Sequence, residues 1–377
     1  MRTTNRSLEQ LRLAARAHSN DLETFVALGD ALYDADEFDE SCRAFERAID
    51  IKPDSPEAAA GLARNLMIQG AYTEAKELLE AAMTHGLPQT AENLSTLAIC
   101  YAFGGDFERA RTLLEAALTV DSTYEPTYGA LARLCLDTRD LEACEHYASE
   151  GLKRFRDNVP CLESRAQARF LTLNLEGAEA DADAAIRLDP ESVDALLCKA
   201  SVLLARGDHD AAIHVLLQAQ AAHPTDPDVY NVLGGAYLAH GDVDQAELSH
   251  AQALEVDPQS WQALHGLAAV ALARHEWEEG LASVDAALEV GGADPALHFL
   301  RGTFLAMLDR REEAAEEFAC AVEANPFDGL SYVSLAELEA DDSQRLDAAR
   351  EHALKALELF PDGPVAERAE RVLARMR

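Results

Sequence analysis

The sequence predicts an all-α fold, an α-solenoid of antiparallel helix hairpins, and three observations carry this prediction. Prolines recur at a fixed interval, because Pro190, Pro224 and Pro258 are 34 residues apart and Pro326 follows two intervals later. Small residues recur on the same period. The composition is 48% hydrophobic but only 6% aromatic, which favours helices built from small residues over a β-sandwich. A hairpin of this length cannot bury its own apolar face, so its neighbours must stack against it.

Three positions hold a small residue in every repeat when the chain is divided into ten units. Counted from the start of each unit, these are the eighth, twentieth and twenty-seventh positions. The eighth position reads Gly29, Ala63, Ala98, Ala132, Ala166, Ala200, Gly234, Ala268, Gly302 and Ala336. We expect these residues to let two helix backbones approach closely, so that a bulky replacement overpacks the contact.

The seventh unit shows why each repeat is read as two helices. Tyr230, Leu233 and Tyr237 follow helical spacing, and a second apolar stretch with the same spacing begins at Val243. Between the two stretches lies Gly241-Asp242, a helix stop followed by an N-cap. Prolines at the first or second position of a unit suit the first helical turn, where no N–H donor is needed. They are Pro56, Pro126, Pro160, Pro227 and Pro295.

These units resemble tetratricopeptide repeats. The first unit supplies the residues of that pattern, namely Phe25, Leu28, Gly29, Leu32, Ser41, Phe45, Ala48 and Pro53. The resemblance implies a single right-handed superhelix with no separate domains. The expected repeats are 22–55, 56–90, 91–124, 125–158, 159–192, 193–226, 227–260, 261–294, 295–328 and 329–363.

The segments outside the repeats, 1–21 and 364–377, are expected to be capping helices. In the first segment Leu8 and Leu11 resemble the apolar face of the second helix of an incomplete unit. Its four arginines, Arg2, Arg6, Arg12 and Arg16, also fit a targeting or membrane-surface segment, but the apolar stripe is short, which favours a cap. In the last segment an apolar stripe runs from Val365 to Met376, and the opposite face is charged and expected to be solvated. That charged face consists of Glu367, Arg368, Glu370, Arg371 and Arg375.

Charged residues replace the usual apolar ones at several repeat positions. Arg165, Lys199 and Arg301 occupy the seventh position, where leucine is usual, and are expected to extend along the seam or to pair with an acidic neighbour. His250 and His298 lie at packing positions and are expected to be structural.

Composition excludes several classes of function. The 68 acidic residues exceed the 32 Lys and Arg, giving a net charge of −36, which disfavours binding to nucleic acid and to anionic lipid. We find no apolar run of membrane-spanning length and no signal peptide. The seven cysteines include no CxxC pair, so we expect reduced core residues in the cytoplasm.

We find no catalytic signature in the sequence. The motifs of zinc proteases, dinucleotide-binding and phosphate-binding loops, and serine hydrolases are absent, and the twelve His are scattered. We therefore expect a protein that is not an enzyme and that holds neither a cofactor nor a metal ion.

The resemblance implies that the first helix of each repeat lines a concave groove. The residues expected to contact a partner there are Arg64, Phe103, Arg133, Gln167, Phe170, Leu171, Ser201, Asn231, His265, Phe299 and Thr303. Only two of them are basic, so the groove does not resemble a clamp for a C-terminal carboxylate. It is largely apolar on an acidic molecule, which suits an apolar or amphipathic polypeptide segment with basic flanks. The preferred hypothesis is an interaction scaffold or adaptor. A self-assembling structural protein and a regulatory subunit of an enzyme complex stay open as alternatives.

Overall fold

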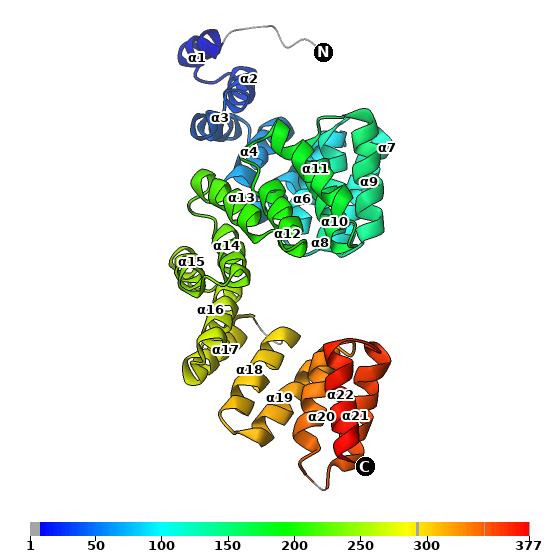
Figure 1. Cartoon of the computed structure of the whole chain (residues 1–377). Coiled ribbons are helices and arrows are strands. Elements are labelled where there is room, and N and C mark those ends of the chain that lie inside the picture. Colours follow the sequence, from blue (N-terminus) through cyan, green and yellow to red (C-terminus); the bar gives the residue numbers. More distant parts are fainter. Residues whose placement is uncertain (1–7, 292–293, 343, 377) are drawn as a thin grey trace. The chain divides into compact units, whose positions relative to one another are not determined.

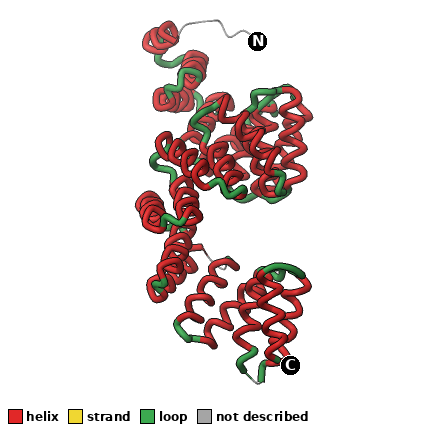
Figure 2. The backbone as a smooth tube through the Cα atoms, viewed as in Figure 1, coloured by secondary structure: helices red, strands yellow, loops and turns green. Residues whose placement is uncertain are grey.

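A computed structural model describes residues 8–291, 294–342 and 344–376 of the chain. The residues described are helical, joined by short loops, and contain no strand (Figures 1 and 2). The fold is therefore all-α, as predicted. Two compact units divide the chain, Met1–Pro190 and Glu191–Arg377. Their boundary falls within the turn that ends the fifth expected repeat, whereas the sequence predicts an undivided solenoid.

The first unit contains a short helix followed by five hairpins. Its helices are α1 Leu8–Ala17, α2 Leu22–Tyr33, α3 Phe38–Ile51, α4 Pro56–Ile68, α5 Tyr72–Thr84, α6 Ala91–Phe103, α7 Phe107–Val120, α8 Pro126–Asp137, α9 Leu141–Arg154, α10 Val159–Leu171 and α11 Leu175–Leu188.

The second unit contains five further hairpins and a final helix. Its helices are α12 Val193–Ala205, α13 His209–Ala222, α14 Pro227–His240, α15 Val243–Val256, α16 Trp261–Arg274, α17 Trp277–Gly291, α18 Pro295–Met307, α19 Arg311–Ala324, α20 Gly329–Glu339, α21 Leu346–Leu359 and α22 Pro364–Arg375. In the eighth repeat the pair Gly291-Gly292 stands where most repeats carry proline, which favours a bend in the stack, and Gly292 lies outside the described residues.

The turns of the first nine hairpins use the same backbone geometry. The residue two positions before the second helix is left-handed, and it is a glycine in Gly70, Gly105, Gly207 and Gly241. An aspartate follows three of these glycines, and it accepts a hydrogen bond from a backbone N–H in the first turn of the second helix, as Asp106 does from Arg109. Asp36, Arg139, Leu173, His275 and Asp309 take the left-handed conformation without being glycine.

The helices pack through the small residues that recur in the sequence. All residues at the eighth, twentieth and twenty-seventh positions of the repeats are buried. Between them, large side chains of the second helices fill gaps left by glycines. The Phe45 ring of α3 lies against Gly29 and Gly61, so close that a Cβ atom on Gly61 would be 2.2 Å from it. His250 of α15 lies between Gly234 and Gly266 in the same way.

Two of the unusual arginines at the seventh position tie neighbouring hairpins together. Arg165 of α10 donates to both carboxylate oxygens of Asp181 in α11, at 2.7 and 2.8 Å, and to Ser149 in α9. Arg301 of α18 bonds Asp285 in α17 and Glu317 in α19. The predicted pairing with acidic neighbours is confirmed for both arginines. In each case the guanidinium joins its own hairpin to the preceding one.

The terminal helices cover the ends of the stacks. Leu11 of α1 is buried against α2, and Arg12 pairs with Glu37 and Glu40. In α22, Ala369 and Val372 are buried against α20 and α21. The predicted solvated face of α22 is wrong at Arg368, which bonds Glu337 at 2.7 Å and Ser334 at 3.0 Å. Of the four arginines behind the alternative targeting hypothesis, Arg2 and Arg6 lie outside the described residues, and Arg12 is held by the two glutamates named above.

Candidate interaction surface

The first helices form one face of each unit. Successive first helices contact each other directly. In the first unit α4 contacts α6 and α6 contacts α8, and in the second unit α12 contacts α14 and α14 contacts α16. We call the surface formed by the outward-facing residues of these helices the inner face. Arg64, Phe103, Arg133, Gln167, Phe170 and Leu171 belong to the first unit. Ser201, Asn231, His265, Phe299 and Thr303 belong to the second. The predicted residues thus form two sets, one in each unit.

Arg64 is the centre of an ion network that spans three hairpins. Its guanidinium bonds Asp30 of α2 and Glu92 of α6, each at 2.7 Å, and lies over the ring of Tyr33 at 5.2 Å from the centroid. Burial raises the pKa of Asp30 despite the attraction of Arg64. Because both of its carboxylate partners are already in place, Arg64 orders this part of the inner face and is not a free anion-binding group.

The other predicted residues of the first unit differ in exposure. Arg133 is exposed and its Nε donates to Asp137 at 3.1 Å. Gln167, Phe170 and Leu171 are half-buried near the end of α10. They give this part of the inner face a mixed apolar and polar character.

Phe103 lies at the rim of the inner face. It is the last residue of α6, its side chain is 64% exposed, and its ring stacks on Tyr72 at a centroid distance of 3.7 Å. Tyr72 is the first residue of α5. Phe103 therefore belongs to the edge where the hairpin turns lie, away from the centre of the predicted groove.

The polar residues predicted in the second unit are mostly engaged by their own helices. The hydroxyls of Ser201 and Thr303 donate to the carbonyl oxygens of Leu197 and Phe299. Asn231 donates to Ser260 at 3.2 Å. The Oδ1 atom of Asn231 is buried and makes no hydrogen bond with the residues described.

Two ring side chains complete the second set. His265 is half-buried, and burial lowers its pKa, so the ring is neutral near pH 7. Phe299 is half-buried against the core, with its ring 5.6 Å from that of Phe318. Phe299 therefore contributes to packing as well as to the inner face.

The described residues bear on metal binding and on the reactivity of the thiols. None of them form a group of three or more His, Cys, Asp or Glu able to hold a metal ion. Burial raises the pKa of Cys100 and Cys135 to about 11 and of Cys144 and Cys161 to about 12, so these thiols stay protonated at neutral pH.

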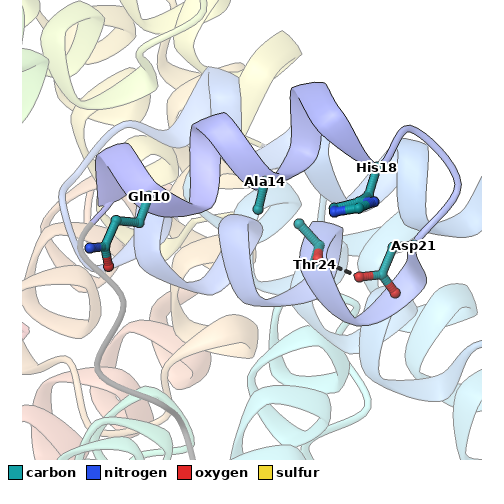
Figure 3. Close-up of a pocket in the computed structure, with 5 residues that line it drawn as sticks. All are labelled: Gln10, Ala14, His18, Asp21 and Thr24. Carbon is teal, nitrogen blue, oxygen red and sulfur yellow. Dashed lines mark hydrogen bonds between the residues drawn. The ribbon is translucent and has the colours of Figure 1, made fainter.

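A small polar pocket lies between α1 and α2 (Figure 3). Its lining residues are Gln10, Ala14, His18, Asp21 and Thr24. Thr24 donates its hydroxyl hydrogen to Asp21, directly before α2.

The sequence interpretation missed the residue with the greatest exposure among the large apolar side chains described, Leu173. It is 82% exposed and left-handed, with φ of 62°. The signal was present in the period, because the second, third, sixth and seventh repeats carry glycine at the equivalent position. A leucine there has neither the flexibility the turn requires nor a core to enter.

No helix in the described part of the chain is long and apolar enough to cross a membrane.

Comparisons with known proteins agree with the fold. A family model described as tetratricopeptide repeat matches residues 164–227, 231–298, 265–329 and 308–364, and a second of the same description matches 32–85 and 66–118. The BBSome complex member BBS4 of Bos taurus is 23% identical over 301 residues, covering 78% of this chain. The chain spans little more than half, 57%, of the length of that relative.

Two solved structures have the same fold. The Cut9-Hcn1 hetero-tetramer of the APC/C has a TM-score of 0.54 at 13% identity, covering 96% of this chain and 99% of that chain. A tetratricopeptide repeat protein from Parabacteroides merdae also has a TM-score of 0.54, at 19% identity, covering 66% of this chain and 98% of that chain. At these identities the likeness establishes the arrangement of helices and nothing about partners.

Proposed function

Because the chain belongs to the tetratricopeptide repeat family, we propose that it is a non-catalytic scaffold that binds a polypeptide segment on the inner face of its first helices. The observation that carries this proposal is the direct contact between successive first helices within each unit. That contact lines up their outward-facing side chains over several hairpins, which is the geometry an extended or helical segment needs.

The partner segment is apolar or amphipathic and has basic flanks. Half-buried apolar residues such as Phe170 and Leu171 would receive its apolar side chains. Aspartates lie close together at the rim of the inner face in the second unit. Burial, and repulsion from the neighbouring Asp226, Asp194 and Asp257, raise the pKa of Asp228. Basic flanks would relieve this repulsion, and the net charge of −36 would speed their approach.

Membership of a larger assembly is the form of scaffold we favour. The relative BBS4 is named as a member of a complex, and a chain with a polypeptide-binding face on each unit has the surface that a subunit needs. A cytoplasmic location would fit this role.

A peptide array tests the proposal directly. Full-length protein is applied to amphipathic peptides that share one apolar core and differ only in whether their flanks carry lysine, glutamate or serine. We expect retention on the lysine-flanked peptides and its reduction by about tenfold in Phe170→Ser, which removes an aromatic contact from the inner face.

The matched control is Leu188→Ser, which removes an exposed apolar side chain from the second helix α11. Both variants are checked for unchanged helicity by circular dichroism. Equal loss of binding in both variants, or equal retention on glutamate-flanked peptides, contradicts a groove on the inner face.

A further inference from the structure

We propose that the hairpin-turn edge of the first unit is a second docking surface, separate from the inner-face groove, and that it takes a basic amphipathic helix from another protein. The hairpin-turn edge is the row of turns between the helices of the second to fifth hairpins. Its exposed apolar residues are Ile68, Phe103 and Leu173, with Tyr72 stacked under Phe103.

The turns lie along one edge because of how the hairpins stack. Each hairpin reverses the chain, so the first helices α4, α6, α8 and α10 run in the same direction, and each contacts the next. Their carboxyl ends therefore share an edge. Contacts between turns agree with this arrangement. Tyr72 from the second hairpin stacks on Phe103 from the third, and Arg111 of α7 bonds Asp140 at the turn of the fourth at 2.9 Å.

This edge exposes large apolar side chains to an unusual degree. Ile68 is 48% exposed and Phe103 64%, and Leu173 is exposed more than either of them. In the fourth hairpin Asp137 stands at the position of Ile68 and Phe103, and Leu136 is half-buried one residue before it. The edge thus exposes large apolar side chains in the second, third and fifth hairpins, and we call these residues the apolar strip. Exposed apolar side chains that gather on the surface of an otherwise acidic chain mark a contact for a partner.

Backbone strain at Leu173 supports the same conclusion independently. Its left-handed conformation is disfavoured for a residue with a Cβ and a branched side chain. Gly70 and Gly105 take the same conformation at the equivalent turns without that strain. Because the leucine side chain gains almost no packing in return, the fold does not explain its presence, and an intermolecular contact does.

A row of glutamates runs beside the apolar strip and sets the chemistry of the partner. Glu74, Glu108, Glu142 and Glu176 each lie in the first turn of a second helix, one per hairpin, and all are exposed. None of these four carboxylates forms an ion pair with any residue that the structure describes. By contrast, the aspartates of the edge are paired.

Those pairs leave the apolar strip itself close to neutral. Asp140 pairs with Arg111, and Asp137 pairs with Arg133. Arg139 is exposed at the fourth turn and favours one acidic residue on the partner at that point. At the other turns, lysine or arginine residues of the partner would pair with the row of glutamates, and its apolar side chains would contact Phe103 and Leu173.

An α-helix matches the spacing of these features. Seven residues of an α-helix rise about 10.5 Å, and packed neighbouring helices are about 8–10 Å apart. A helix laid across the turns can therefore present one apolar residue to each hairpin at heptad spacing, with basic residues along one side. A second copy of this chain would bring another net charge of −36 to the contact, and anionic lipid would face the glutamate row, so neither is the favoured occupant.

Binding of a designed helix to the full-length protein tests the proposal. The probe is a labelled helical peptide with leucine at every seventh position and lysines beside it. Two control peptides replace the lysines by glutamate or shuffle the leucines while keeping the charge. Fluorescence anisotropy at low salt is expected to show binding of the probe alone.

Two variants locate the site. Leu173→Gly is expected to weaken binding about tenfold and to raise the Tm, because glycine removes the strain. Glu108→Lys with Glu142→Lys is expected to weaken binding by a similar factor. The matched controls are Leu248→Ser and Glu255→Lys with Glu289→Lys, exposed positions of the second unit, which should leave the affinity unchanged.

Four results would overturn the proposal: absence of probe binding, equal binding of the shuffled peptide, concentration-dependent dimers that Leu173→Gly abolishes, and capture by anionic vesicles. Phe170→Ser separates the two surfaces. It should leave binding of the designed helix intact even if the inner-face proposal is correct, and failure of the inner-face test does not affect the result at the edge.

Discussion

At one packing position of the repeat, a large ring side chain is accommodated by glycines on the neighbouring helices. Phe45 and His250 occupy the same position in different repeats, and each ring is accommodated by two glycines, Gly29 and Gly61 for the first and Gly234 and Gly266 for the second. His250 is 4% exposed, and its Nδ1 is buried without a hydrogen-bond partner among the described residues. The imidazole is therefore packed as a neutral ring.

Acid is expected to destabilise the second unit through His250. Burial, with a smaller contribution from His265, lowers the pKa of His250 from 6.5 to about 4. Between these two pH values the unfolded chain binds a proton at His250 and the folded chain does not. The free energy of unfolding is therefore unaffected by His250 above pH 6.5 and decreases as the pH falls from 6.5 to about 4. The loss amounts to about 3 kcal/mol. We expect His250→Phe to abolish this acid-dependent loss, because a phenylalanine, Phe45, already fills the equivalent position of the first repeat.

Chemical denaturation of wild type and His250→Phe between pH 7 and pH 4 measures this effect. Other groups titrate equally in both proteins, so the difference between the two curves reports His250. His265 lies on α16, against which His250 packs, and His265→Phe serves as a control with a smaller effect. Parallel curves for wild type and His250→Phe would contradict the prediction.

At the scale of the helices, the close contacts depend on residues that have almost no side chain. Ala246 and Ala253 lie seven residues apart on α15, and both are fully buried. Replacing Ala246 by leucine is expected to force α14, α15 and α16 apart and to cost about 1–3 kcal/mol. The control is Ala251→Leu on the exposed face of the same helix, which should change stability little. Thermal unfolding measures both, and equal Tm values would contradict the packing described here.

The helices and their seams could be predicted from the sequence because the period repeats the same physical constraint ten times. A small residue at a fixed position, such as Ala246, is informative only when its equivalents are also small. The ion pairs of Arg165 and Arg301 could be predicted in kind, since a charge at a buried seam requires a partner.

Features that occur once escaped the sequence interpretation. Arg368 lies on the face of α22 that its apolar stripe predicts to be solvated, but its long side chain reaches Glu337 of α20. Leu173 was missed because a leucine after a helical stretch predicts burial, although glycines at the equivalent positions of other repeats indicate a turn, and its left-handed backbone shows that turn. The predicted groove residues were found at helix positions, whereas the edge depends on turns, where the helical period carries no information.

At the scale of the whole molecule, each compact unit has apolar clusters of its own. In the first unit they include Leu79, Leu114 and Leu131, and in the second they include Phe304 and Val333. Repeat proteins draw their stability from contacts within and between adjacent repeats, so a segment of several complete hairpins retains most of its own stabilising contacts.

Two separate chains, residues 1–190 and 191–377, are therefore each expected to fold. Each should be strongly helical by circular dichroism and unfold cooperatively. The properties assigned to single residues should segregate with them. Acid sensitivity should follow His250 into the second chain, and binding of the designed helix should follow Leu173 into the first. An unfolded fragment would show that the clusters of that unit are insufficient by themselves, and acid sensitivity divided equally between the two would show that His250 is not its source.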